Sequence, residues 1–268
     1  MGWAGRIVAI MAMALAPGAA LACGADTDCV LGDRTYRIAL PDGDGPFGAI
    51  VFMHGYRGTA AGIMVNPSFR AMANDLGVAL IAPQSGGEDW LIRHSPHRGL
   101  TDDELEFSYF DALLDDVLAR FPIDPDRMLA AGFSAGGMMT WTLACHRGDR
   151  FKGFLPVSGT FWAPIPTECP SAPVDLIHIH GMTDTVVPID GRPIADTNQG
   201  NVFDALGLFA EAGGFGASEP VLKPPPALTC SESTNQGGRR IALCLHEGGH
   251  AVEADWIRFG YDALVGAP

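Results

Sequence analysis

The chain has 268 residues and is strongly acidic, since 31 Asp and Glu residues outnumber 17 Lys and Arg residues and give a formal net charge of −14 at pH 7. This composition offers no basic surface to hold phosphate groups and therefore argues against a nucleic-acid partner. The acidity favours solubility but does not identify a substrate.

Residues 1–22 have the pattern of a secretory signal peptide. The apolar run Ile7–Ala16 follows Arg6, and Ala20-Leu21-Ala22 provides a small-residue cleavage site. The run is too short to span a bilayer, and we expect no membrane-spanning segment in the mature chain. We predict a secreted or periplasmic protein whose residues 23–268 form one domain.

The cysteines are even in number, and in an exported chain this favours disulfides. Six cysteines allow fifteen pairings, of which we predict nearest-neighbour pairing: Cys23–Cys29, Cys145–Cys169 and Cys230–Cys244. A lipid anchor on Cys23 is one alternative, although Ala20 is a poor match to the leucine expected three residues earlier. Zinc binding by the thiols is another, but no C-x-x-C spacing supports it.

Strand-like and helix-like segments alternate along the chain, which predicts a mostly parallel central sheet with helices on both faces. We expect strands at Arg34–Leu40 (an edge strand), Gly48–Met53, Gly77–Ala82, Met128–Ala131, Phe151–Val157, Val174–His180 and Ile241–His246. We expect helices at Asp103–Phe121, around Met138–Ala144, at Asn201–Ala212 and at Ala251–Leu264. Gly213–Gly238 is rich in Gly, Pro and Ser and is interpreted as a long surface loop.

The most informative motif is Gly132-Phe133-Ser134-Ala135-Gly136, which lies between a predicted strand and a predicted helix. This G-x-S-x-G pattern is typical of the nucleophile elbow of the α/β-hydrolase fold. The tight turn requires residues without bulky side chains on both sides of the serine, and glycine provides them. Ser134 would project from the sheet edge, and the N–H of Ala135 would be free to stabilise an oxyanion.

Two further segments follow strands at the positions where this fold carries catalytic partners. Asp184 lies in the turn after Val174–His180, and His250 follows the last predicted strand. The order Ser134, Asp184, His250 is the nucleophile–acid–base order of the fold. A serine hydroxyl needs a base to take its proton, and the base needs a carboxylate to fix its tautomer.

Several segments resemble the secreted esterases grouped as polyhydroxybutyrate depolymerases and feruloyl esterases. They are Met53-His54-Gly55, Asp124-Pro125, Gly132–Met139, Leu143-Ala144-Cys145, His178–Pro188 and Gly248-Gly249-His250. The resemblance extends from about Arg34 to the end of the chain. It implies a serine carboxylesterase with Ser134 as nucleophile, Asp184 as acid and His250 as base, and with the N–H groups of Tyr56 and Ala135 as the oxyanion hole.

The sequence departs from this family in two ways. The family often continues Gly-Gly-His with Thr-Trp-Pro, whereas this chain has Ala251-Val252-Glu253, so we expect a difference in the acyl or alcohol pocket. Polymer-degrading members often carry a separate substrate-binding domain, and we expect none here. We therefore expect a small or oligomeric ester substrate rather than an insoluble polymer.

Alternatives exist for the catalytic acid and for the base. Asp190 lies in the same loop as Asp184 and could be the acid, and His246 could be the base. His178 and His180 lie two apart on one strand and could mimic metal ligands, but no third ligand has a recognisable spacing. We interpret His94 and His97 as solvated loop residues.

We expect the substrate pocket to be lined by Tyr56, Arg57, Met138, Trp90 and Trp162, the two tryptophans because they follow predicted strands. The function predicted from the sequence is ester hydrolysis through an acyl-enzyme, without metal or other cofactor. The alternatives are an exported serine peptidase on the same fold and a non-catalytic binding protein on a hydrolase scaffold.

Overall fold

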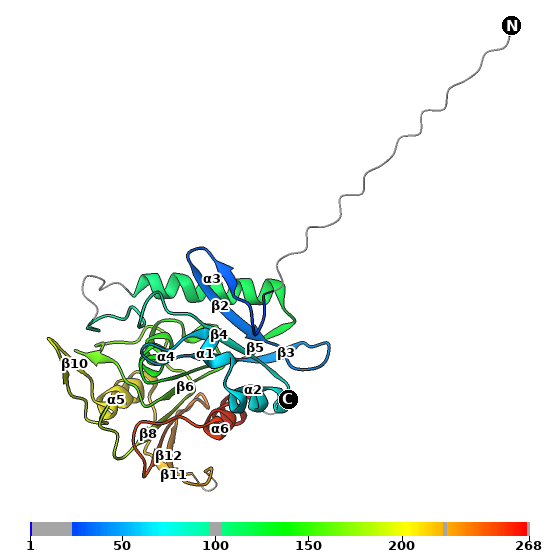
Figure 1. Cartoon of the computed structure of the whole chain (residues 1–268). Helices are drawn as coiled ribbons and strands as arrows, with labels where there is room; N and C mark the ends of the chain where they lie inside the picture. The colour runs from blue at the N-terminus through cyan, green and yellow to red at the C-terminus, as the bar shows by residue number, and fades with distance from the viewer. Residues whose placement is uncertain (2–22, 97–102, 222–223, 267–268) are drawn as a thin grey trace.

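The computed structural model describes residues 1, 23–96, 103–221 and 224–266, and its centre is a large twisted sheet (Figure 1). Ten strands pair in the order β1 (Cys29–Leu31), β2 (Arg34–Ala39), β4 (Val78–Pro83), β3 (Phe47–Met53), β5 (Ile123–Phe133), β6 (Gly153–Val157), β8 (Leu176–Gly181), β13 (Arg240–His246), β12 (Thr229–Thr234) and β11 (Glu219–Pro220). The strands from β4 to β13 in this order are parallel, and the strands outside them pair antiparallel. The predicted mostly parallel central sheet is confirmed.

The helices divide between the two faces of the sheet because successive strand residues point to opposite faces. One core contains Ala49, Val51 and Met53 of β3 with α3 (Glu104–Arg120), α4 (Ala135–His146) and α5 (Val202–Gly213). The other contains Ile50 and Phe52 with α1 (Ala60–Met64), α2 (Pro67–Asp75) and α6 (Ala254–Leu264). Figure 1 shows α3 above the sheet and α2 and α6 below it. Burial on both faces explains why β3, β4, β6 and β8 are apolar runs.

The predicted parallel strands and the four predicted helices are confirmed, with ends that differ by a few residues. Asn201 begins α5 as its N-cap, where its side chain accepts hydrogen bonds from Phe203 N and Asp204 N. Because cap residues have non-helical backbone angles, the helix itself starts one residue later than predicted.

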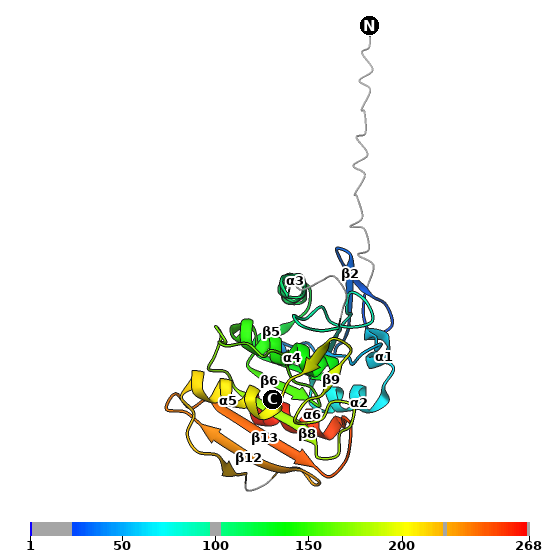
Figure 2. The same cartoon turned by 90° about the vertical axis from the view of Figure 1, so that its left-hand side faces the viewer.

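Two predictions about the edges of the sheet are wrong. Arg34–Leu40 is not an edge strand, because the short antiparallel strand β1 covers β2 on its outer side. Gly213–Gly238 is not simply a loop, because it contains β11 and β12. β12 has the polar sequence Thr-Cys-Ser-Glu-Ser-Thr and lies beside β13 (Figure 2), so its backbone pairing is not visible in an apolar pattern.

A second, three-stranded sheet was not predicted. It consists of β7 (Trp162–Ala163), β10 (Thr197–Gln199) and β9 (Pro193–Ile194), with β10 in the middle and both pairings antiparallel. These strands have two or three residues each, too few to produce a periodic pattern. The sheet lies at one side of the cavity described below.

The three predicted disulfides are all present. Cys23 bonds Cys29, Cys145 bonds Cys169, and Cys230 bonds Cys244. Cys230 and Cys244 are directly opposite in the β12–β13 ladder, so this bridge ties the antiparallel addition to the last parallel strand. The disulfides use every cysteine that zinc would need as a thiolate.

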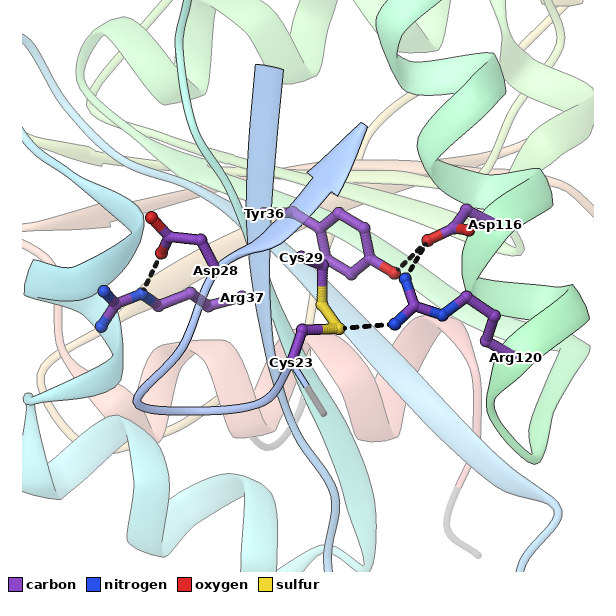
Figure 3. Close-up of a disulfide and its surroundings, with 7 residues drawn as sticks. All are labelled: Cys23, Asp28, Cys29, Tyr36, Arg37, Asp116 and Arg120. Atoms are coloured by element: carbon purple, nitrogen blue, oxygen red, sulfur yellow. Dashed lines mark hydrogen bonds and ion pairs between the residues drawn. A yellow bond between two sulfur atoms is a disulfide. The ribbon is translucent and has the colours of Figure 1, made fainter. Parts of the chain in front are cut away.

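The first disulfide fixes the start of the described chain against α3 (Figure 3). Tyr36 of β2 donates to Asp116 Oδ2 over 2.6 Å, and Arg120 bonds both Asp116 Oδ2 and Cys23 Sγ at 2.8 Å. Burial and the neighbouring Asp116 raise the pKa of Tyr36, so its hydroxyl stays a donor. A sulfur that is bonded to Cys29 cannot also carry a lipid, so this state of Cys23 is incompatible with the lipid-anchor alternative.

The predicted signal peptide and His97 lie outside the described residues. Within the described part, no helix has the length and apolar character that crossing a membrane requires.

Candidate active site

The predicted nucleophile occupies a strained turn between β5 and α4. Ser134 has φ 58° and ψ −119°, a conformation that L-residues rarely adopt, and its N–H donates to Val157 O of β6 over 2.9 Å. A Cβ at position 132 would lie 2.2 Å from Gly136 O, and one at 136 would lie 2.0 Å from Met53 O. Both glycines of the motif are therefore required by close backbone packing. The turn directs Ser134 away from the sheet, at the start of a helix.

Asp184 and His250 are brought together by the ends of neighbouring parallel strands. β8 ends just before Asp184, β13 ends just before the segment with His250, and the two strands are paired. His250 Nδ1 lies 2.7 Å from Asp184 Oδ2. Asp184 Oδ1 accepts the backbone N–H groups of Val186 and Val187 at 2.8 and 2.9 Å, so the buried carboxylate is held in one orientation. Because Nδ1–H of His250 donates to the Asp184 carboxylate, Nε2 is the ring nitrogen that remains free to accept a proton.

The ring of His250 packs against the residue that precedes the serine. The centroids of the His250 and Phe133 rings are 4.6 Å apart. In the described residues the Ser134 hydroxyl makes no hydrogen bond with His250, and such contacts often tighten only when substrate binds. The site thus combines a close Asp–His pair with a half-buried serine at the same sheet edge.

The alternative acid and base lie in ordinary structural environments. Asp190 is exposed, and its Oδ1 accepts from Asn201 Nδ2 over 3.3 Å. His246 ends β13, is buried against Trp256 with ring centroids 4.5 Å apart, and accepts the N–H of Gly248. Burial lowers the pKa of His246. The geometry favours Asp184 and His250 over these two residues.

His178 and His180 bond each other beneath the Asp184 turn. His178 Nε2 lies 2.9 Å from His180 Nδ1, and His180 Nε2 donates to Val187 O over 2.8 Å. Burial lowers the pKa of both rings, most strongly for the fully buried His178, so both are neutral. The described residues contain no group of three or more His, Cys, Asp or Glu side chains arranged to hold a metal ion.

His54 stabilises the turn that carries Tyr56, the second predicted oxyanion donor. Its Nδ1–H donates to Gly55 O over 2.8 Å, while its Nε2 accepts the N–H of Ser85. Burial lowers the pKa of His54, which keeps the ring in this neutral form. Gly58 N bonds Gly55 O at 2.8 Å and closes the turn that carries Tyr56.

Both predicted oxyanion donors are available for a ligand. Ala135 is the first residue of α4, where backbone N–H groups have no partner within the helix. The N–H groups of Ala135 and Tyr56 make no backbone hydrogen bond elsewhere in the described residues. A Cβ at Gly55 would be 3.4 Å from Ser134 Cβ, so the turn with Tyr56 lies against the serine.

A cavity of about 570 Å³ lies in front of these groups. Ser134, Ala135, Tyr56, Met138 and Trp162 line it, as predicted for a substrate pocket near the serine. It is large enough for a drug-sized ester. A second cavity of about 380 Å³ also includes Trp162 in its wall, together with His94, but contains none of the predicted catalytic residues.

Two predicted pocket residues do not line this cavity. Trp90 is fully buried, and its Nε1–H donates to His54 O over 2.9 Å, so it supports the turn with Tyr56 rather than touching a substrate. Arg57 is exposed and bonds Glu88, with Nε 3.2 Å from Oε1. The short sequence distance to Tyr56 does not bring its side chain inside, because the chain turns at Arg57 with φ 58°.

The sequence analysis missed several cavity residues. Glu88, Asp89, Pro96 and Val186 are among them, and so are three residues in or beside the small sheet: Arg192, Ile194 and Gln199. These three come from the small sheet, whose sequence Arg192–Gln199 is polar and carries no motif. Only the pairing of β10 with β7 and β9 brings them to the cavity.

The sequence of this chain is similar to those of several known proteins. The profile described as "Prolyl oligopeptidase family" matches residues 87–163, which include the elbow. A protein named "Putative esterase NocK" from Nocardia uniformis subsp. tsuyamanensis is 27% identical over 260 residues, 87% of this chain and 74% of that protein. Feruloyl esterase C of Emericella nidulans is 28% identical over 168 residues, 59% of this chain and 57% of that enzyme. The chain thus spans little more than half of the fungal enzyme.

Solved structures agree on the fold. An acetyl xylan esterase from Aspergillus awamori superposes with a TM-score of 0.60 at 14% identity, covering 85% of this chain and 94% of that one. S-formylglutathione hydrolase from Staphylococcus aureus gives a TM-score of 0.58 at 15% identity, covering 89% and 96%. With the sequence relatives, this makes the chain an α/β hydrolase of the esterase type.

Proposed function

We propose that this hydrolase is an exported serine carboxylesterase, with residues 23–268 as its catalytic domain, and that Ser134, His250 and Asp184 are its nucleophile, base and acid. The observation that carries this proposal is the meeting of three sequence-distant groups at one sheet edge. A strained serine begins a helix, and an Asp–His pair 2.7 Å apart packs against the residue before it. The disulfides and the signal-peptide pattern of residues 1–22 support export.

In the proposed reaction, Ser134 Oγ attacks the ester carbonyl while His250 Nε2 takes its proton. The carbonyl oxygen becomes negative and is stabilised by the N–H groups of Ala135 and Tyr56. His250 then protonates the leaving alcohol, and an acyl group remains on Ser134. A water molecule, deprotonated by His250, releases the acid and restores the serine. The Asp184 carboxylate stabilises the cationic ring in both steps.

The substrate is proposed to be a soluble short-chain, aromatic or oligomeric ester. The cavity beside Ser134 has an apolar wall that includes Met138 and Trp162, and its volume suits such acyl groups. The sequence relative named as a feruloyl esterase supports an aromatic ester as one candidate.

A peptidase is the second candidate, because the prolyl oligopeptidase profile matches residues 87–163. This match covers the elbow and its flanking elements, which ester and amide hydrolases share. It therefore supports the serine chemistry more than the choice of an amide bond.

A substrate panel tests the proposal. p-Nitrophenyl esters, methyl ferulate, soluble hydroxybutyrate oligomers, polyester film and a chromogenic peptide amide should be assayed with the mature enzyme and with Ser134→Ala. We expect rapid hydrolysis of the soluble esters, slower release from film at equal ester concentration, and no amide cleavage. Amide cleavage that exceeds ester cleavage would favour the peptidase, and inactivity on every ester would refute the esterase.

A further inference from the structure

The small sheet places three different side chains in one row on the wall of the cavity. Gln199 of β10 pairs with Trp162 of β7, and its N–H donates to Arg192 O over 2.9 Å on the other side. Residues directly opposite in a sheet point to the same face. Trp162, Gln199 and Arg192 all line the cavity that contains Ser134, so an aromatic ring, an amide and a guanidinium face the same space. The backbone of the small sheet can be found at β10 in Figure 1 and at β9 in Figure 2.

We propose that Arg192 and Gln199 form a subsite for a carboxylate carried by the ester, so that the enzyme prefers acidic esters over neutral ones. This inference rests on the esterase function proposed above and specifies its substrate class. It covers esters with the free acid on the acyl side, such as monoesters of dicarboxylic acids, and esters with the acid on the alcohol side, such as acylated hydroxy acids.

Gln199 provides the first independent observation. The residue is 8% exposed, and its buried Oε1 has no hydrogen-bond partner in the described part of the chain. An unpaired buried amide group is costly, so it indicates a partner that arrives with a ligand. The two ends of a side-chain amide exchange by a simple rotation, so Gln199 can donate an N–H to a carboxylate that enters the cavity.

Arg192 provides the second observation. Its Nε donates to Val186 O over 2.9 Å, which ties the side chain to the turn whose N–H groups hold Asp184. Among the described residues its two Nη groups make no ion pair or hydrogen bond. A guanidinium fixed through Nε keeps two parallel N–H groups that match a carboxylate.

The charges around the cavity agree with this assignment. Arg192 is the cationic residue among the described residues that line the cavity. Glu88, which also lines the cavity, is engaged by Arg57 and by the Tyr56 hydroxyl. Asp89 is buried and accepts the N–H of Trp90. The net charge of −14 repels anions in general, so the attraction of an anionic substrate would have to come locally from the Arg192 guanidinium at the cavity.

The test compares matched pairs of esters that differ only in charge. Monoethyl glutarate and its neutral ω-amide carry the difference on the acyl side, and 4-acetoxybutyrate and its amide carry it on the alcohol side. kcat/KM is measured for each with the mature enzyme, Arg192→Met, Arg192→Lys, Gln199→Leu and the control Arg70→Met. Arg70 is a suitable control because it is exposed, donates to Met64 O and has no ion pair in the described residues.

We expect the enzyme to prefer the acidic member of at least one pair by about tenfold, the lower range for a charge-assisted hydrogen bond because Arg192 is exposed. Arg192→Met should remove that preference, Arg192→Lys should restore part of it, and Gln199→Leu should reduce it about threefold. Arg70→Met should leave the ratio unchanged, and high salt should lower it.

Three results would overturn the inference. The first is equal hydrolysis of the acidic and the neutral member in both pairs, which would leave the esterase function intact. The second is an equal loss on both members of a pair in Arg192→Met, which would mean that Arg192 only balances Glu88 and Asp89. The third is no hydrolysis of any ester, which would refute the proposed function as well. Thermal unfolding of each variant separates these results from misfolding.

Discussion

The cavity is bounded by two regions that are built in opposite ways. The edge formed by β5, β8 and β13 belongs to the parallel sheet; β8 is buried along its whole length, and most residues of β5 and β13 are buried. The small sheet β7–β10–β9 has strands of two or three residues, and β9 and β10 are only partly buried. Backbone pairing and packing fix the first region firmly, as catalysis requires, while the second can vary in sequence without disturbing the core.

This comparison predicts that the two regions have different roles in the reaction. Changes at the parallel edge should lower the rate on every substrate, and changes in the small sheet should alter which substrate is preferred. The following predictions test this difference in roles, beginning with the largest effect.

Ser134→Ala should lower kcat by about four to six orders of magnitude on all esters, because both chemical steps pass through Oγ. The fold should persist, since the Ser134 hydroxyl makes no hydrogen bond within the described part of the chain and the backbone N–H still binds Val157 O. Kinetics on p-nitrophenyl acetate and circular dichroism provide the measurement, with Ser68→Ala as the surface control. More than about a tenth of the original kcat would place the nucleophile elsewhere.

Asp184→Asn should lower kcat by about three to four orders of magnitude, because the amide would favour the wrong tautomer of His250. Asp190→Asn is the matched control, since the same change is made in the same loop at a residue that bonds only Asn201 among the described side chains. It should change kcat less than threefold. The assignment of the acid fails if the two variants lose activity equally.

Removal of the Cys230–Cys244 bridge by alanine substitution should lower the free energy of unfolding by about 3 kcal/mol, from the entropy of a closed loop. The separation is 14 residues here and 6 for Cys23–Cys29, so removal of the latter should cost about 2 kcal/mol. Urea unfolding compares the two, after peptide mapping without reduction has verified both bridges. The reverse order of stabilities, or free thiols at 230 and 244 in exported protein, would contradict this account.

Acid should destabilise the fold through His178. Burial lowers its pKa well below the ordinary value, so the unfolded chain takes up a proton below about pH 6.5 while the folded chain does not. The unfolding free energy should therefore fall with decreasing pH by up to about 1.4 kcal/mol per unit from this residue. His178→Gln keeps a donor for His180 and removes the titration. The variant should lose less stability than the parent between pH 7.5 and pH 5.5, and parallel curves would show that His178 is not responsible.

Trp162→Ala should raise KM about fivefold and affect kcat less, because this residue forms a cavity wall rather than contacting the reacting atoms. Initial rates over a range of methyl ferulate concentrations measure both constants. A loss confined to kcat would mean that the small sheet also takes part in the chemistry.

The two regions also differ in how far the sequence predicts them. The parallel strands are apolar runs, the elbow requires glycine at 132 and 136, and Asp184 and His250 follow strands that must end at the same edge. These features depend on local sequence and on the rules of parallel sheets. For this reason the proximity of Asp184 and His250 can be predicted from the sequence.

The wall of the cavity is a different case. Arg192 and Gln199 reach it only through the register of three very short strands, and β12 is a polar strand stabilised by its neighbour and a disulfide. Trp90 follows a strand as predicted, but it is covered by the turn that it supports. Such placements depend on tertiary pairing, which short polar segments do not encode in their own pattern.

The central claim, that Ser134 is activated by the His250–Asp184 pair, is tested most directly by covalent labelling. The mature enzyme is incubated with a fluorophosphonate, digested and mapped by mass spectrometry, in parallel with Ser134→Ala and His250→Ala. We predict a single modified peptide with the phosphonyl group on Ser134, no label in Ser134→Ala, and labelling slowed by at least about a thousandfold in His250→Ala. Label on another residue, or equal labelling rates with and without His250, would contradict the account.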